Sequence, residues 1–257
     1  MQKEFFFKHI NYKEEFKEDY MSNKKIGCLP IVMIICIVII FSICKLYKDD
    51  SKGFKDIKEN VISEDKDKNL SIKWDKLPDN CIAWIHFKNP KIISYPVMQS
   101  EDNDYYLHRN IKGKYSFAGS IFMDYNNHSD FLDKNTILYG HNMANETMFG
   151  SLKNFKEKSY WDKHNQFYIY TRNGYRLKYK IYNTVIVNPS SDIYTYKFGN
   201  EENMNSYIHN WVKKGLYKTN LLPDSKDHLI SLSTCQYQGT KRLVVQAYLI
   251  EKKNIGK

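Results

Sequence analysis

The chain has 257 residues, with 21 tyrosines and 14 phenylalanines, and a formal net charge of +10. This length suffices for one or two domains with a sizeable core, and the aromatic and β-branched content favours strands over helices. A basic balance favours acidic surroundings such as nucleic acid, anionic lipid or an anionic cell wall. Because the sequence has no Lys/Arg block, no RNA-binding signature and no cysteine–histidine finger, we expect no nucleic-acid partner.

The N-terminal part combines a charged segment with an apolar one. Residues 1–25 carry mixed charges, and the run over residues 26–43 has no charged residue and approaches the ~20 residues that span a bilayer. We therefore expect a transmembrane anchor over residues 26–47 that crosses the cell membrane once, with the N-terminus in the cytoplasm and the long remainder outside. The alternatives are a buried core helix and a cleaved signal peptide, although the leader is long and no A-x-A site follows the run.

The remainder divides by composition at Trp74. Charged residues dominate residues 48–73, which predicts a solvated stalk or an amphipathic helix. Residues 74–257 resemble a globular domain, and their many short apolar segments between turn residues predict an antiparallel sandwich or barrel. The expected strands cover residues 83–87, 92–98, 119–124, 136–139, 167–171 and 175–187, with a final pair within 228–250. Helical spacing is expected in residues 149–164 and 203–216.

The final strand pair carries a cysteine and an arginine. Cys235 ends the first strand, on the same face as Ser233, and Arg242 begins the second strand after a short loop that contains Gly239. Paired strands lie about 5 Å apart, so the thiol and the guanidinium are expected to meet at one rim of a sheet, where the cation favours the thiolate. The alternative is a structural cysteine beside a surface arginine.

A cysteine nucleophile needs a general acid to protonate the leaving amine. His141 is the candidate, because it follows a short strand and Gly140 in TILYGHN and so stands at a strand end. A structural histidine is the alternative there. For His86, His108, His128, His164, His209 and His228 a surface or hydrogen-bonded structural role is the default, and His9 precedes the apolar run.

The cysteines give little support to disulfides or metals. Cys28, Cys36 and Cys44 belong to the predicted anchor segment, and Cys81 and Cys235 lack a spacing pattern, although they could pair in an oxidising compartment. No CxxC pair, HExxH motif or calcium-like acidic cluster occurs. We therefore expect no metal and no cofactor.

Several motifs together resemble the sortase family of cysteine transpeptidases. LYGHN is followed by LSTC, with Cys235 94 residues after His141, and Arg242 follows seven residues later before LVV. The blocks YPVMQSEDNDYYL, GSIFMDY, NTILYGHNM and MFGSLKNF are similar to class B members. Ser231 replaces a commoner threonine, and the cysteine–arginine loop is shorter by one or two residues, which leaves Lys241 as a rival partner. The resemblance implies a mainly β fold, a closed eight-stranded barrel with an N-terminal helical extension and a helix inserted before the final hairpin.

The resemblance also implies a reaction and its partners. Cys235 attacks a threonine carbonyl in an NPxTN-like or (S/P)PxTG-like sorting signal at the C-terminus of a surface protein, Arg242 stabilises the oxyanion, and His141 transfers protons. The acceptor is a peptidoglycan-precursor (lipid II) amine at the membrane. Four residues would line the substrate groove, with core packing or a loop turn as their alternatives: Asn103, Leu107, Tyr139 and Ser233. A pilin-polymerising sortase, a cysteine hydrolase and an inactive wall-binding module are the other functional interpretations.

Overall fold

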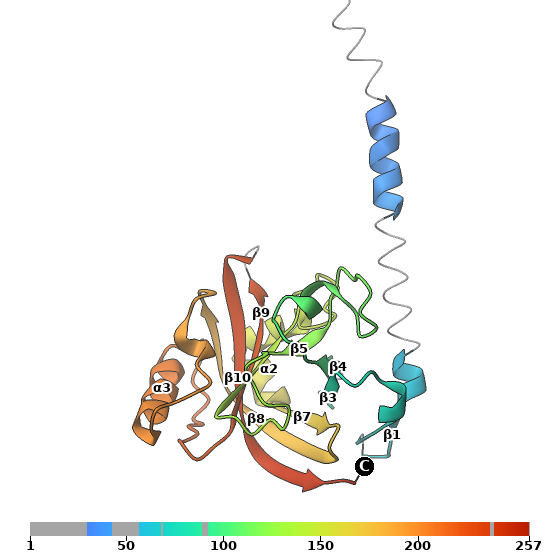
Figure 1. The fold of residues 1–257 in the computed structure, drawn as a ribbon. Coiled ribbons are helices and arrows are strands. Elements are labelled where there is room, and N and C mark those ends of the chain that lie inside the picture. Colours follow the sequence, from blue (N-terminus) through green and yellow to red (C-terminus); the bar gives the residue numbers. More distant parts are fainter. Residues whose placement is uncertain (1–29, 43–56, 68, 89–91, 237–238, 257) are drawn as a thin grey trace, which may run out of the picture. The chain divides into compact units, whose positions relative to one another are not determined.

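The computed structural model describes residues 30–42, 57–67, 69–88, 92–236 and 239–256. Two compact units divide the chain, one over Met1–Asp56 and one over Ile57–Lys257 (Figure 1).

The first unit corrects the predicted membrane anchor. Its described part is a helix over residues 30–42 with exposed side chains. In the described part of the chain, no helix combines the length and the apolar character that a membrane crossing requires. The predicted localisation, a membrane protein with a single-pass anchor, is therefore wrong. The expected bounds of that segment, residues 26–47, include residues 26–29 and 43–47, which lie outside the described residues. Residues 1–25, predicted to be cytoplasmic, lie outside the described residues.

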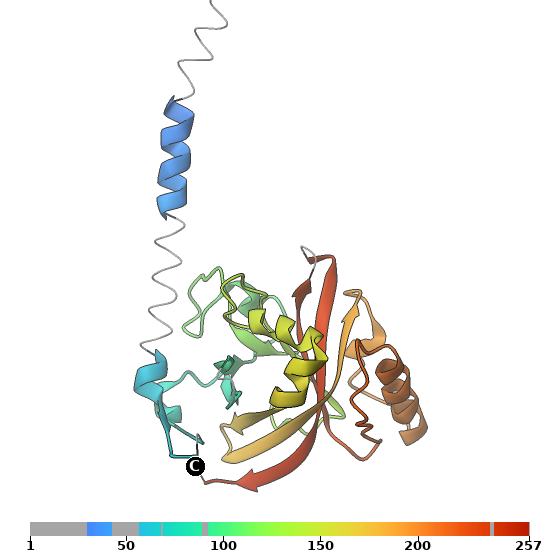
Figure 2. The ribbon, with the colours of Figure 1, turned by 180° about the vertical axis from the view of Figure 1, so that it is seen from behind.

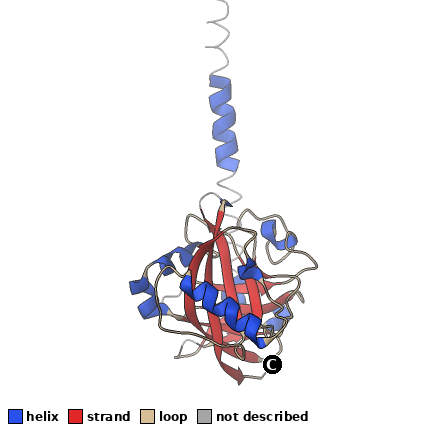
Figure 3. Cartoon of the chain, turned by 90° about the vertical axis from the view of Figure 1, so that its left-hand side faces the viewer, coloured by secondary structure: helices blue, strands red, loops and turns tan. Residues whose placement is uncertain are grey.

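The second unit is built on a β-barrel. Within the described residues, eight strands close on one another in the order β10-β8-β7-β3-β4-β5-β6-β9 (Figure 3). They are β3 (Cys81–His86), β4 (Ser94–Met98), β5 (Ile121–Met123), β6 (Asn135–Tyr139), β7 (Gln166–Thr171), β8 (Tyr175–Val187), β9 (Leu229–Gln236) and β10 (Lys241–Asn254). The predicted mainly β class and the closed barrel are confirmed.

The barrel is not wholly antiparallel. β4 pairs with β5 and β6 pairs with β9 in parallel, whereas the remaining neighbours are antiparallel. Parallel neighbours need a long crossover connection instead of a tight turn. A loop joins β4 to β5, whereas the chain between β6 and β9 includes the barrel strands β7 and β8. The candidate site draws residues from both connections.

Short helices decorate the barrel. They are η1 (Trp74–Lys76), η2 (Tyr105–His108), η3 (Gly150–Lys156), α2 (Lys158–His164), η4 (Asp192–Tyr194) and α3 (Glu201–Lys213). The helix predicted over residues 149–164 is divided into η3 and α2, because Glu157 between them is extended (Figure 2). The predicted inserted helix is confirmed as α3. The side chain of Asn200 caps α3, and Met204, Tyr207, Ile208 and Trp211 form its buried stripe.

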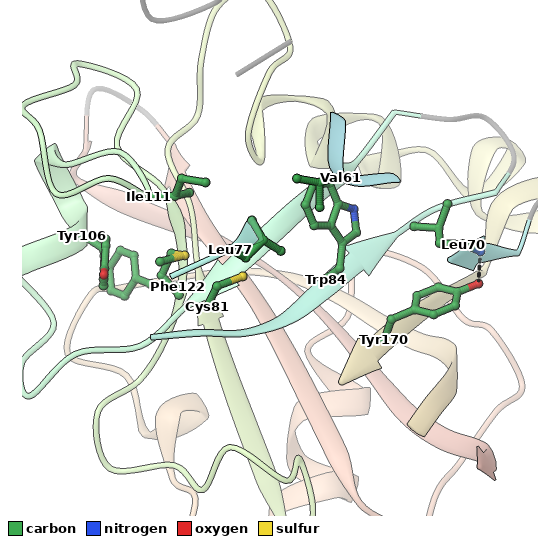
Figure 4. Packing of buried hydrophobic residues seen from close by; sticks show 10 residues of the cluster. Val61, Leu70, Leu77, Cys81, Trp84, Tyr106, Ile111, Phe122 and Tyr170 are labelled. Atoms are coloured by element: carbon green, nitrogen blue, oxygen red, sulfur yellow. Dashed lines mark hydrogen bonds between the residues drawn. The ribbon is translucent and has the colours of Figure 1, made fainter. Parts of the chain in front are cut away.

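The N-terminal edge of this unit packs against the barrel core. Residues 57–61 are helical, and a hairpin of β1 (Ile62–Glu64) and β2 (Leu70–Ile72) follows. Val61 and Leu70 are buried in a cluster with Trp84 and Tyr170, and the Tyr170 hydroxyl accepts a hydrogen bond from the Leu70 amide at 3.1 Å (Figure 4). The compact unit therefore starts within the segment expected to be a charged stalk or helix.

Candidate active site

The residues proposed from sequence meet in one cavity of about 500 Å³. Its lining includes all seven of them: Asn103, Leu107, Tyr139, His141, Ser233, Cys235 and Arg242. They come from the connection between β4 and β5, from β6 and its end, and from β9 and β10. The barrel thus collects residues that are up to 139 positions apart (242 − 103) into one site.

The cysteine and the arginine are directly opposed. Cys235 on β9 and Arg242 on β10 are cross-strand partners, so their side chains leave the same face of the sheet. The guanidinium of Arg242 donates from Nη1 to the carbonyl oxygens of Gly239 at 2.7 Å and Lys241 at 3.1 Å. Lys241, the rival partner, instead pairs with Gln236 and donates to Asn188 Oδ1 at 2.5 Å. The cavity lining contains Arg242 and not Lys241.

Cys235 and Cys81 have different surroundings. Both are thiols, so the alternative of a disulfide between them is wrong. Cys235 is half-buried in the cavity wall, whereas Cys81 is fully buried in the core. Burial raises the pKa of the Cys81 thiol to about 12, so this cysteine is held as an unreactive core thiol.

His141 is oriented by the backbone of a distant loop. It follows β6 and Gly140, and its Nε2 lies 2.7 Å from the carbonyl oxygen of Leu107. A carbonyl oxygen can only accept, so Nε2 carries a hydrogen and Nδ1 is the nitrogen that gains and loses a proton. Burial lowers the pKa of His141, and the nearby His108 acts in the same direction, while the Leu107 carbonyl opposes them.

Gly140 allows this chain path. A Cβ at position 140 would lie 2.8 Å from the ring of Phe149, which is fully buried. The amide of Phe149 in turn donates to the His141 carbonyl oxygen at 3.0 Å. A glycine before the histidine is therefore required by packing, and the packing fixes the backbone from which the imidazole projects.

Comparisons with known proteins identify the family. A family model of the sortase domain matches residues 90–250. Sortase B of Listeria monocytogenes is 34% identical over 182 residues, which cover 69% of this chain and 72% of the relative. Sortase B of Staphylococcus aureus is 27% identical over 180 residues, covering 69% and 73% of the two chains.

The chain is a class B sortase. It is therefore a cysteine transpeptidase. A solved structure of sortase B from Bacillus anthracis superposes with a TM-score of 0.69 at 30% identity, covering 80% of this chain and 99% of the other. The Staphylococcus aureus sortase B–substrate complex gives a TM-score of 0.65 at 27% identity, covering 69% and 82%.

A buried carboxylate that the sequence reading missed organises one wall of the sortase cavity. Asp124, just after β5, accepts hydrogen bonds at Oδ2 from Asn103 Nδ2 at 2.9 Å and from the Tyr139 hydroxyl at 3.0 Å. Burial, together with the charge of Asp124, raises the pKa of Tyr139, so the phenol remains a donor. In the sequence Asp124 stands within the block GSIFMDY, whereas its partners Asn103 and Tyr139 lie in other blocks.

A second feature that was missed lies next to Tyr139, whose ring is 6.1 Å from that of Tyr194. The connection between β8 and α3 supplies four lining residues, Pro189, Ser190, Ser191 and Tyr194. The hydroxyls of Tyr194 and Ser233 lie 2.9 Å apart, and burial raises the pKa of Tyr194. Ser233 is therefore hydrogen-bonded to the β8–α3 connection. Leu107 and Tyr139 both line the cavity and pack against the core.

The described residues contain no evident metal-binding site. No group of three or more His, Cys, Asp or Glu side chains lies close enough there to hold a metal ion. The expectation that the enzyme needs no metal or cofactor stays a prediction.

Proposed function

We propose that this sortase cleaves a C-terminal sorting signal of the NPxTN or (S/P)PxTG type after threonine and joins the new carboxyl end to a peptidoglycan amine. The observation that carries the proposal is the single cavity in which Cys235, His141 and Arg242 lie together with the four groove residues. In this assignment Cys235 is the nucleophile, His141 the proton carrier and Arg242 the oxyanion donor. The catalytic domain predicted over residues 74–257 is then part of the compact unit Ile57–Lys257.

The first half-reaction forms an acyl-enzyme. The Cys235 thiolate attacks the threonine carbonyl carbon, a C–S bond forms, and the carbonyl electrons move to oxygen, where the Arg242 guanidinium donates hydrogen bonds. When the carbonyl reforms, the C–N bond breaks and the leaving amine takes a proton from His141. Because Nε2 is fixed on Leu107, the transferred proton resides on Nδ1. Asn103 and Tyr139, held by Asp124, are placed to contact the peptide.

The second half-reaction releases the product. The acceptor amine attacks the thioester carbon and gives its proton to the neutral His141 Nδ1, a C–N bond forms, and the C–S bond breaks to regenerate the thiolate. The lowered pKa of His141 favours this step, because it keeps the imidazole neutral at ordinary pH. It also means that only a minor fraction of His141 carries the proton needed in the first half-reaction.

The proposal is tested by incubating the full chain with peptides of both motif types and mapping the cleaved bond by mass spectrometry. We expect cleavage after threonine, formation of an amide when an amine is added, and no turnover by Cys235→Ala. Full activity of Cys235→Ala would overturn the proposal. Release that is independent of the amine, with water as the acceptor, would instead favour a cysteine hydrolase, and joining of a lysine side chain of a pilin would favour a pilin polymerase.

A further inference from the structure

A series of aromatic rings leads outward from His141. The ring of His108 lies 5.4 Å from that of His141, and the ring of Tyr115 lies 6.4 Å from His108 at an angle of 24°. His108 is exposed, and Tyr115 is 68% exposed. Neither residue lines the cavity that contains Cys235. The two rings, here called the outer ring pair, therefore adjoin the proton carrier without belonging to the groove proposed for the sorting signal.

The exposure of the outer ring pair is not a consequence of a loose loop. The Ser116 amide donates to the His108 carbonyl oxygen at 3.0 Å, and Arg109 and Tyr115 form an isolated antiparallel bridge. The Asn110 side chain accepts from the amides of the turn, and Ser120 Oγ donates to the Arg109 carbonyl oxygen at 2.8 Å. This bonding presents the rings to solvent in a fixed arrangement. Rigid, exposed aromatic residues beside a site are typical of a binding surface.

The same segment is basic. Between Tyr105 and Ser120 the sequence contains Arg109, Lys112 and Lys114 and no acidic residue. Lys112 and Lys114 are exposed near the tip of the turn. A ligand for this surface should therefore combine faces that pack on rings with carboxylate groups that complement the cations.

The reaction supplies such a ligand. A transpeptidase has two substrates, and the second must bring its amine to His141, which accepts the proton from that amine. A peptidoglycan fragment carries amino sugars, whose C–H faces pack on aromatic rings, and peptide carboxylates near its amine. We propose that the outer ring pair, with Lys112 and Lys114, is the subsite for this acidic glycopeptide acceptor. The inference rests on the proposed function and adds the place where its second substrate binds.

The test separates the two half-reactions in the full chain. The substitution Tyr115→Ala removes an exposed ring, and the pair Lys112→Gln and Lys114→Gln removes the charges. For both variants we measure acyl-enzyme formation with a sorting peptide, then transfer to a purified muropeptide and to triglycine, a small amine without sugar. We expect KM for the muropeptide to rise about tenfold, because that is the effect of losing one favourable ring contact. The KM for triglycine should change much less. The charge variant should also lose most of the salt dependence of muropeptide transfer.

Two controls keep the outcome clear. Tyr115→Phe retains the ring and should keep the muropeptide KM near that of the wild type, and Leu222→Ala, a remote exposed residue, should have no effect. An unchanged muropeptide KM in Tyr115→Ala, or an equal rise for triglycine, would overturn the subsite. Failure of the wild type to form any acyl-enzyme would instead contradict the proposed function.

Discussion

Arg242 on β10 stands directly across from Cys235 on β9, and its guanidinium donates to the carbonyl oxygen of Gly239 in the intervening loop at 2.7 Å. The backbone of the short loop therefore holds the Arg242 guanidinium through this hydrogen bond. A guanidinium has five N–H donors in a rigid plane, so groups not used on Gly239 and Lys241 remain available for a substrate oxygen. The short loop between β9 and β10 is thus compatible with the cross-strand pairing of Cys235 and Arg242.

The first prediction concerns the geometry of the Arg242 side chain. In Arg242→Lys the charge remains, but the planar fork that can bind a loop carbonyl and an oxyanion together is lost. We expect kcat for peptide cleavage to fall about 10²- to 10³-fold, as for removal of an oxyanion donor, with little change in thermal stability. Single-turnover acylation measures the effect. Lys241→Ala is the matched control and should retain activity; near wild-type activity of Arg242→Lys would exclude the assigned role.

The second prediction concerns Asp124. Both carboxylate oxygens of Asp124 accept hydrogen bonds, Oδ2 from Asn103 and Tyr139 and Oδ1 from Asn126. In Asp124→Asn the NH2 group must therefore face donors on one side, so the groove wall loses its fixed arrangement. We expect KM for the sorting peptide to rise about tenfold, equivalent to one lost charge-assisted hydrogen bond, whereas alkylation of Cys235 by iodoacetamide should keep its rate. Steady-state kinetics and alkylation rates provide the two measurements.

A double-mutant cycle shows whether Asp124 acts through Tyr139. Tyr139→Phe removes one donor from Asp124 Oδ2, so its effect in the Asp124→Asn background should be smaller than in the wild type. Asp162→Asn, on the exposed side of α2, is the matched control. Strict additivity of the two substitutions, or a parallel loss of alkylation, would mean that Asp124 stabilises the fold without positioning the groove.

The contrast between Cys235 and Asp124 explains which residues of the site could be predicted from the sequence. Cys235, His141 and Arg242 are recognisable because each stands at a strand end within a distinctive motif, and strand pairing then brings them together. Asp124 acts through hydrogen bonds to residues on other elements, which no local pattern reveals. Tyr194 comes from an irregular connection, and the group that orients His141 is a backbone carbonyl.

In the N-terminal regions, predictions based on average composition were misleading. A run of apolar residues predicted an anchor, but among the described residues, which include a helix over 30–42, no helix has the length and apolar character of a membrane span. The charged segment that follows contains few apolar residues, and two of them, Val61 and Leu70, are buried in the core. Composition averaged over a segment conceals such isolated contacts, and these contacts place the start of the compact unit before Trp74.

The third prediction links a glycine to the orientation of His141. Gly119 has a φ of +58°, and a Cβ there would lie 2.4 Å from the carbonyl oxygen of Leu107, the acceptor for His141 Nε2. Gly119→Ala must therefore displace this carbonyl as well as strain the backbone. We expect a loss of about 2 kcal/mol in unfolding free energy, a Tm lower by roughly 4–8 °C, and reduced kcat.

Thermal unfolding and peptide cleavage check both parts of this prediction. Gly199→Ala is the control, because its Cβ would meet only Asn203 Nδ2 at 3.4 Å, and both its Tm and its kcat should stay near those of the wild type. If Gly119→Ala lowers Tm but leaves kcat unchanged, the Leu107 carbonyl is not required to orient His141.

The fourth prediction follows from the lowered pKa of His141, for which burial is the largest cause. The unfolded chain, with an ordinary histidine pKa near 6.5, binds a proton at this residue at a higher pH than the folded enzyme does. The folded state is therefore at full stability above about pH 6.5 and loses stability as pH falls below this value. In His141→Gln the amide can still donate to Leu107 but does not titrate, so the loss of unfolding free energy between pH 8 and pH 5 should be smaller than in the wild type. Urea unfolding at the two pH values measures the difference. His209→Gln, on α3 and outside the cavity, should behave as the wild type. If the unfolding free energy of His141→Gln falls as much between pH 8 and pH 5 as that of the wild type, the buried imidazole of His141 is not the source of this pH dependence.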